Sequence, residues 1–103
     1  MYILVNEVFD WDRDNLRKIR AHRVRVEEAE QVLLNDPIPI YEQIVEGEIR
    51  FVYYGETNPG RLLGIIVTER ADQIRVVTAY DLDAGQKREY LDRRMKGEKR
   101  CLG

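Results

Sequence analysis

The sequence is poor in the residues that build metal sites and disulfides. It holds one histidine, His22, and one cysteine, Cys101. A structural zinc site usually needs four such ligands and a disulfide needs two cysteines, so neither is expected within one chain. The sequence also has no Walker loop, dinucleotide fingerprint or serine elbow, the usual signs of nucleotide-binding or serine-nucleophile chemistry. We therefore expect a function without a metal or nucleotide cofactor.

Long apolar runs are missing as well. No stretch approaches the roughly 20 residues that span a bilayer, and the opening residues 1–5 lack the basic region of a secretory signal. A single cysteine fits a reducing compartment better than an oxidising one. These features predict a cytoplasmic protein with no membrane partner.

Length and composition predict a single domain over residues 1–103, with 44% hydrophobic and 35% charged residues. The net charge of −2 hides a separation of charge. Residues 12–25 carry six cations and two acids, residues 26–48 carry seven acids and no cation, and residues 86–100 carry seven cations and three acids. The basic segments could meet a polyanion or an acidic partner, or they could be solvated helix faces.

Helical patterns lie at both ends of the sequence. Two N-terminal helices are predicted over residues 12–22 and 26–34, the first capped by Asp12. A C-terminal helix begins at Asp83, whose spacing from Gln86 fits a capping box. We expect this helix to turn three apolar side chains inward: Tyr90, Leu91 and Met95.

Strand patterns fill the middle of the sequence. Residues 48–55 alternate between polar and apolar, residues 62–68 are almost all apolar, and residues 74–80 follow a tight turn at residues 71–72. They form a three-stranded antiparallel meander, to which residues 2–8 or 38–45 could add a fourth strand. Pro37 and Pro39 confine any strand over residues 38–45 to an edge or an irregular arm. The predicted fold class is α+β, with two N-terminal helices and one C-terminal helix.

The turns allow the strand register to be estimated. A two-residue turn at 71–72 sets Thr68 opposite Arg75, and a loop that pairs Gly55 with Arg61 sets Glu48 opposite Thr68. Residues directly opposite each other share a face. One face then carries a polar cluster, and small apolar residues that include Ala79 complete that face. The cluster consists of Glu48, Arg50, Thr68, Arg70 and Arg75.

Three converging guanidinium groups suit a phosphate, because arginine presents a fork of charged donors. Glu48 beside them could act as a general base or as their counter-ion. His22, near the end of the first helix, could transfer protons near neutral pH or complement the helix dipole. Tyr54, Tyr80 and Tyr90 could stack on bases or belong to the core; Tyr80 has the parity of the buried face.

Several short motifs, taken in order, resemble the BrnT toxins of bacterial type II toxin–antitoxin modules. The resemblance begins at Phe9-Asp10-Trp11-Asp12 and Asn15-Leu16-Arg17, and it continues through Ala21-His22-Arg23-Val24 and Val26-Glu27-Glu28-Ala29. It then covers Gly47-Glu48-Ile49-Arg50-Phe51 with Gly55, Thr68-Glu69-Arg70, Ile74-Arg75-Val76-Val77-Thr78-Ala79 and Tyr90. Each motif is short, so their order and spacing carry the resemblance.

The resemblance implies a RelE-like fold and metal-independent RNA cleavage, with neutralisation by an antitoxin that has a ribbon-helix-helix DNA-binding domain. It places His22, Arg50, Arg70 and Arg75 on the catalytic face. In this setting Glu48 or His22 would handle protons, and Tyr80 and Tyr90 would bind RNA.

The sequence departs from the family pattern at three positions. Arg23 replaces the usual glycine, Tyr80 an arginine, and Gln86 an acid. A weakened or inactive relative that acts by protein binding is therefore the alternative to a ribonuclease toxin. A nucleic-acid-binding module without chemistry fits the basic helices, but it does not fit the acidic middle of the chain.

Overall fold

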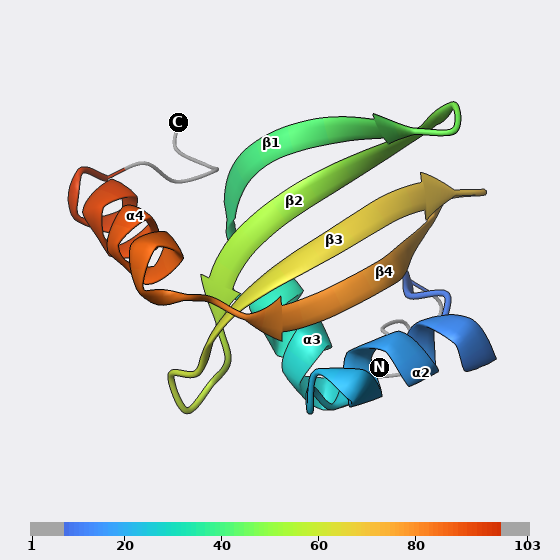
Figure 1. Ribbon diagram of the computed structural model, residues 1–103, viewed down its shortest axis with the longest axis horizontal. Coiled ribbons are helices and arrows are strands. Elements are labelled where there is room, and N and C mark those ends of the chain that lie inside the picture. The colour runs from blue at the N-terminus through green and yellow to red at the C-terminus, as the bar shows by residue number, and fades with distance from the viewer. Residues whose placement is uncertain (1–7, 98–103) are drawn as a thin grey trace.

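Four strands within residues 8–97 form one antiparallel sheet with helices on both sides. A computed structural model describes residues 8–97. The elements in chain order are α2 (Arg13–Ala21), α3 (Val26–Leu34), β1 (Ile38–Val45), β2 (Glu48–Glu56), β3 (Leu62–Arg70), β4 (Gln73–Asp81) and α4 (Ala84–Met95). The strands are ordered β1-β2-β3-β4 (Figure 1). The predicted α+β class is confirmed, with the fourth strand supplied by residues 38–45.

Local capping explains where the first and last helices begin. Asp12 accepts a hydrogen bond from the Asn15 backbone at 3.0 Å, and the Asn15 side chain accepts one from the Asp12 backbone at 2.7 Å. Asp83 and Gln86 exchange the same two bonds at the start of α4. Each pair satisfies two backbone N–H groups that a helix start otherwise leaves free. The expected caps are therefore confirmed.

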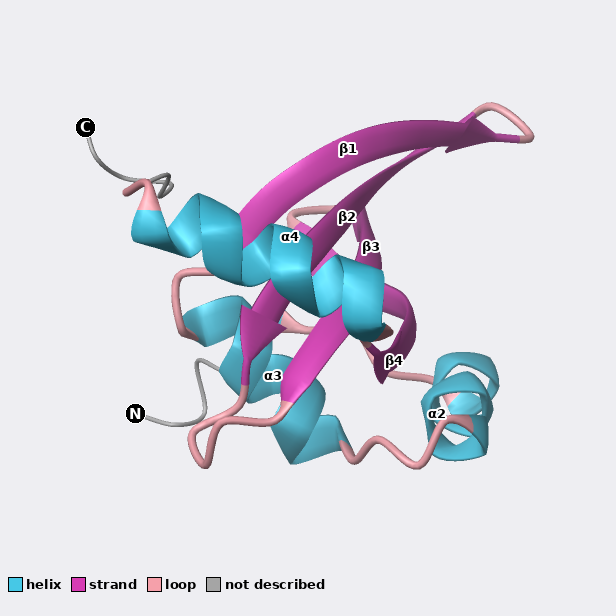
Figure 2. Cartoon of the chain, turned by 60° about the vertical axis from the view of Figure 1, so that its left-hand side comes forward, coloured by secondary structure: helices cyan, strands magenta, loops and turns pink. Residues whose placement is uncertain are grey.

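Two clusters of buried side chains lie on opposite faces of the sheet. In the first cluster, Ile19, Val24 and Val32 from the N-terminal helices and their connecting turn pack on strand residues such as Ile65 and Val76. In the second, Ile38, Val52, Tyr54, Leu82 and Tyr90 pack under α4. Figure 2 shows α4 and α3 on different sides of the sheet, and Figure 1 shows α2 running beside β4.

α4 covers only part of the sheet face beneath it. The uncovered part lies toward the β1–β2 turn and the β3–β4 turn. We call this face, which carries Arg50, Ile66 and Tyr80, the open face. Next to the turn between β3 and β4, the register is as predicted, with Thr68 opposite Arg75. The predicted register across β2 and β3 is wrong by two residues, because Gly55 pairs with Leu63 and not with Arg61. Side chains alternate with a period of two, so this shift leaves every β2 residue on its expected face.

An extra residue in β4 changes the faces of the residues that follow it. Val67 pairs with Val76, whereas Ile66 pairs with Thr78, so Val77 is a β-bulge. Beyond the bulge the parity is reversed. Ala79 is therefore in the first core and not on the open face, and Tyr80 lies on the open face opposite Gly64. Both expectations were wrong, because sequence alternation does not reveal an inserted residue.

Two further expectations have different outcomes. β1 is an edge strand with a register shift between Pro39 and Tyr41, as the prolines suggested. The prediction that α4 turns three apolar side chains inward is right only for Tyr90, since Leu91 and Met95 are 48% and 85% exposed. The possible strand over residues 2–8 falls almost wholly outside the described residues.

The turn between β3 and β4 is strained, because Ala71 and Asp72 have φ values of 54° and 69°. Replacing them with Asn-Gly should raise the free energy of unfolding by about 1 kcal/mol, since a type I′ turn requires positive φ at both positions. Denaturant unfolding with an unchanged m-value measures this. A midpoint that stays the same or falls would contradict the assigned turn.

Candidate functional site

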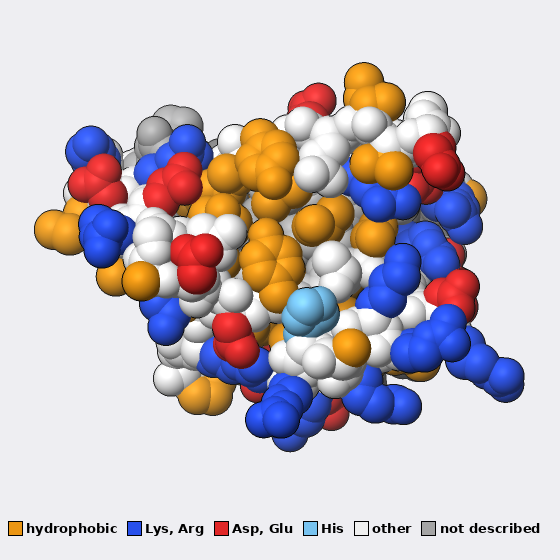
Figure 3. All heavy atoms as spheres, in the orientation of Figure 1, with side chains coloured by type: hydrophobic (Ala, Val, Ile, Leu, Met, Phe, Trp, Pro, Cys, Tyr) orange, Lys and Arg blue, Asp and Glu red, His pale blue; other side chains and the backbone are white. Residues whose placement is uncertain are grey.

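A charged hollow lies between α2 and one end of the open face, the end next to the β1–β2 and β3–β4 turns. Its volume is about 160 Å³, smaller than the roughly 300–1,000 Å³ of pockets for drug-sized ligands and better matched to a compact ion. It is lined by Asp14, Asn15, Lys18, Glu48, Arg50, Arg70, Arg75 and Val77. Figure 3 shows lysine and arginine side chains gathered at this end of the face, with hydrophobic side chains in its centre.

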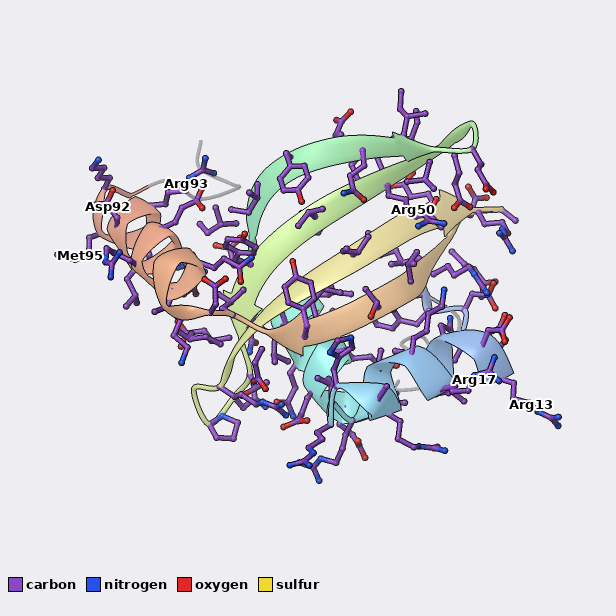
Figure 4. All side chains as sticks on the ribbon, viewed as in Figure 1. Arg13, Arg17, Arg50, Asp92, Arg93 and Met95 are labelled. Carbon is purple, nitrogen blue, oxygen red and sulfur yellow. The ribbon has the colours of Figure 1, made fainter. Side chains whose placement is uncertain are left out.

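Glu48 joins two of the arginines of this hollow. Its carboxylate lies 3.0 Å from Arg50 Nε and 3.5 Å from Arg70 Nη2, and Figure 4 places Arg50 on β2 near the turns. The hydrogen bond from Arg50, with the charge of Arg70, holds the pKa of Glu48 below its ordinary value of 4.5. An ionised, hydrogen-bonded carboxylate is a weak proton acceptor near neutral pH, so the geometry favours the counter-ion role.

Arg75 is tied to the start of α2. Its Nη1 lies 2.6 Å from Asp12 Oδ2 and 3.8 Å from Asp10 Oδ2. The hydrogen bond from Arg75 lowers the pKa of Asp12, which also caps α2. Arg75 therefore does two things: it lines the hollow, and it fastens α2 to β4.

His22 lies outside this hollow, at the other end of α2. Its ring meets the Tyr80 ring edge-on, with the ring centroids 6.4 Å apart. Lys18 is four residues earlier, so it lies about 6 Å away along the same face of the helix, and it lines the hollow. Sequence reasoning missed Lys18 and Asp14, although their spacing of four and eight residues from His22 would have indicated a shared helix face.

The two tyrosines expected to bind RNA differ in their surroundings. Tyr80 lies over Gly64, where an added Cβ would come within 2.6 Å of its ring, and burial raises the Tyr80 pKa to about 12. Tyr90 is completely buried, and its hydroxyl donates to Glu56 Oε2 at 2.9 Å and accepts from Arg94 Nη2 at 2.9 Å. No face of Tyr90 is open for stacking, which leaves Tyr80 as the candidate.

Arg61 holds together the elements around His22, and sequence reasoning did not single it out. Its guanidinium donates to both oxygens of Asp81, at 2.9 and 3.0 Å. The same group donates to Glu28 Oε1 at 2.9 Å and to the Arg23 carbonyl at 3.0 Å. Through these bonds Arg61, the residue just before β3, fixes the end of β4, the start of α3 and the turn that directly follows His22.

The described part of the chain offers neither a cluster of metal ligands nor a membrane-spanning helix. Residues 8–97 contain no group of three or more histidine, cysteine or acidic side chains placed to hold a metal ion. No helix within these residues is long and apolar enough to cross a membrane.

A family model described as the ribonuclease toxin, BrnT, of type II toxin–antitoxin systems matches residues 11–86. The chain belongs to the BrnT family. The match covers most of the chain and includes every residue of the charged hollow, as well as His22 and Tyr80. No protein of curated function matches the chain. Membership of a toxin–antitoxin family implies an antitoxin partner.

The three departures from the usual BrnT pattern have distinct surroundings. Arg23 has a φ of 60°, a conformation that a glycine adopts without strain. Tyr80 occupies the open face beside His22. Gln86 closes the capping box of α4 by accepting a hydrogen bond from the Asp83 backbone at 2.9 Å, which an acid could also do.

The Arg61 network predicts a dependence of stability on pH. Bonds from Arg61 hold the pKa of Asp81 below 3.8. Burial disfavours ionised Glu28, but hydrogen bonds from the Arg25 backbone and from Arg61 outweigh burial and hold its pKa below 4.5. Because the unfolded chain takes up these protons more readily, the stabilisation is complete above about pH 5 and is lost as the pH falls through these values.

Arg61→Met should therefore lower the free energy of unfolding by about 1–2 kcal/mol at pH 7, a modest loss because Asp81 is largely exposed. The difference in free energy of unfolding between wild type and the variant should narrow as the pH falls from 5 to 3. Urea unfolding at several pH values measures both. A gap that stays constant with pH would mean that Arg61 acts through packing alone.

Proposed function

We propose that this protein is a metal-independent endoribonuclease toxin that a cognate antitoxin neutralises. The observation that carries the proposal is the charged hollow, where Lys18, Arg50, Arg70 and Arg75 surround a space of about 160 Å³, large enough to admit a phosphate. Four cations against two carboxylates give this space a positive balance. The family supplies the ribonuclease class, and the hollow supplies a site for the RNA backbone.

The proposed reaction is attack of a ribose 2′-hydroxyl on the adjacent phosphate. Arg50, Arg70 and Lys18 would stabilise the extra negative charge of the five-coordinate transition state. His22, along the same face of α2, would exchange protons with the attacking or leaving oxygen. The P–O5′ bond breaks as the new bond forms, so the products are a 2′,3′-cyclic phosphate and a 5′-hydroxyl.

The other residues of the site would have supporting roles. Glu48 would hold Arg50 and Arg70 in position through its ion pairs, and Arg75 would hold α2 in place through Asp12. Tyr80 offers an aromatic surface beside His22 on which a flanking base could stack. In this proposal the protein acts in the cytoplasm, has a RelE-like fold and meets an antitoxin with a ribbon-helix-helix domain.

A binding protein without catalysis is the second candidate. It is favoured by the ion pairs of the hollow, since each of the three arginines already has a carboxylate partner. A phosphate would have to compete with Glu48 and Asp12 for these groups. The next experiment separates the two candidates.

Arg50→Ala should lower RNA cleavage by about 100- to 1,000-fold, because it removes one donor to the transition state. Purified wild type and variant are compared on RNA in the presence of EDTA, and the new ends are tested for cyclic phosphate. Arg88→Ala, which removes an exposed cation of α4, is the matched control. Loss of the wild-type activity in EDTA would refute metal independence, and a folded wild type that never cleaves would support the binding protein.

His22→Gln tests the proton-transfer role. The variant should cleave about 100-fold more slowly, and its remaining activity should depend less on pH than that of wild type, because glutamine cannot exchange protons with the reacting oxygens. Glutamine keeps a polar side chain of similar size, so the fold should persist. A wild-type rate with an unchanged pH profile would assign His22 to helix capping only.

A further inference from the structure

A second hollow lies on the other side of α2, between this helix and α3. We call it the α2–α3 notch; its volume is about 390 Å³. Leu16 and Val26 contribute apolar surface, and Arg20, Arg23 and Arg25 surround it together with a single acid, Glu27. The notch is therefore an apolar recess with a strongly basic border.

The notch and the charged hollow face in different directions. At 100° per residue, Arg20 lies about 200° around α2 from Lys18. Arg13 extends the basic surface at the start of α2, where Figure 4 shows its side chain pointing away from the sheet, whereas Arg17, one turn later, is paired with Asp14. A ligand of the charged hollow would therefore not cover the notch.

The border arginines are available to a partner. Within residues 8–97, neither Arg20 nor Arg23 has a carboxylate within ion-pair distance. Arg25 is only weakly engaged, 3.8 Å from Glu28.

We propose that the α2–α3 notch binds an acidic segment of a partner protein. An apolar side chain of that segment sits against Leu16 and Val26, and its carboxylates pair with Arg20 and Arg23. Arginine suits this task because its planar fork holds a carboxylate with two parallel hydrogen bonds. The proposal does not depend on RNA cleavage.

A protein segment fits the notch better than RNA does. The recess beneath the arginines is apolar and has no aromatic side chain among its lining residues, whereas single-stranded RNA is usually held by aromatic stacking. Apolar anchors bordered by arginine are typical of protein–protein interfaces. The chain as a whole carries a net charge of −2, so the basic surface is confined to this region, whereas nucleic-acid-binding domains are usually basic overall.

The test is a selection of random 12-residue displayed peptides on the immobilised chain. The notch variant is Arg20→Glu/Arg23→Gly, in which glycine suits the positive φ of position 23. The control variant, Lys87→Glu/Arg88→Gln, removes the same amount of charge from the exposed face of α4. Thermal unfolding of both variants verifies that they are folded.

Enriched peptides should combine acidic residues with at least one large apolar residue. One such peptide, synthesised with a fluorescent label, should bind the notch variant at least tenfold more weakly than wild type and the control within about twofold. Three outcomes would overturn the proposal: enrichment of non-acidic peptides, equal losses of peptide affinity in both variants, or no enrichment on wild type relative to the notch variant. If an RNA oligonucleotide binds the notch variant more weakly than wild type while the labelled peptide binds both equally, the surface would be assigned to RNA.

Discussion

The arrangement of the open face depends on one extra residue in β4. Without the bulge at Val77, Arg75 and Tyr80 would project to opposite faces, because they are five positions apart and strand side chains alternate. The bulge reverses the parity between them. Arg75 can therefore line the charged hollow while Tyr80 reaches His22, and Ala79 is small enough to fill the first core beneath them. Bulges commonly re-aim side chains in this way near functional sites.

Arg75 and Arg61 hold the two ends of α2 in place beside the sheet. Arg75 binds the cap at the start of the helix, and Arg61 binds the backbone carbonyl just beyond its end. Helices of nine residues are marginal on their own, so α2 depends on these attachments and on the packing of Ile19. The position of Lys18 and His22 is therefore set by contacts with strands that are distant in sequence.

Much of the fold was readable from local patterns. Caps such as Asp12 and Asp83, the tight turn at residues 71–72 and the alternation in β2 each report on a few neighbouring residues, and the structure agrees with them. The bulge at Val77 and the two-residue shift between β2 and β3 depend on how whole strands fit together, so local patterns did not reveal them. The exposure of Leu91 was missed because α4 covers only one end of the sheet.

The candidate site was predictable to the extent that it follows strand parity. Glu48, Arg50, Arg70 and Arg75 came together because an error of two residues preserves the face. The spacing of Lys18 from His22 indicated a shared helix face, but its place in the hollow depends on how α2 packs beside the sheet, which is a tertiary arrangement. Arg61 was missed for the same reason, since its four acceptor atoms belong to three separate segments.

The shortness of α2 has a mechanical consequence. Two and a half turns of helix move as one rigid rod, so the arginines on its outer side cannot shift without carrying Lys18 and His22 along. Because Arg75 and Arg61 hold both of its ends, the helix keeps its basic outer side and the side that carries Lys18 at a fixed angle to each other.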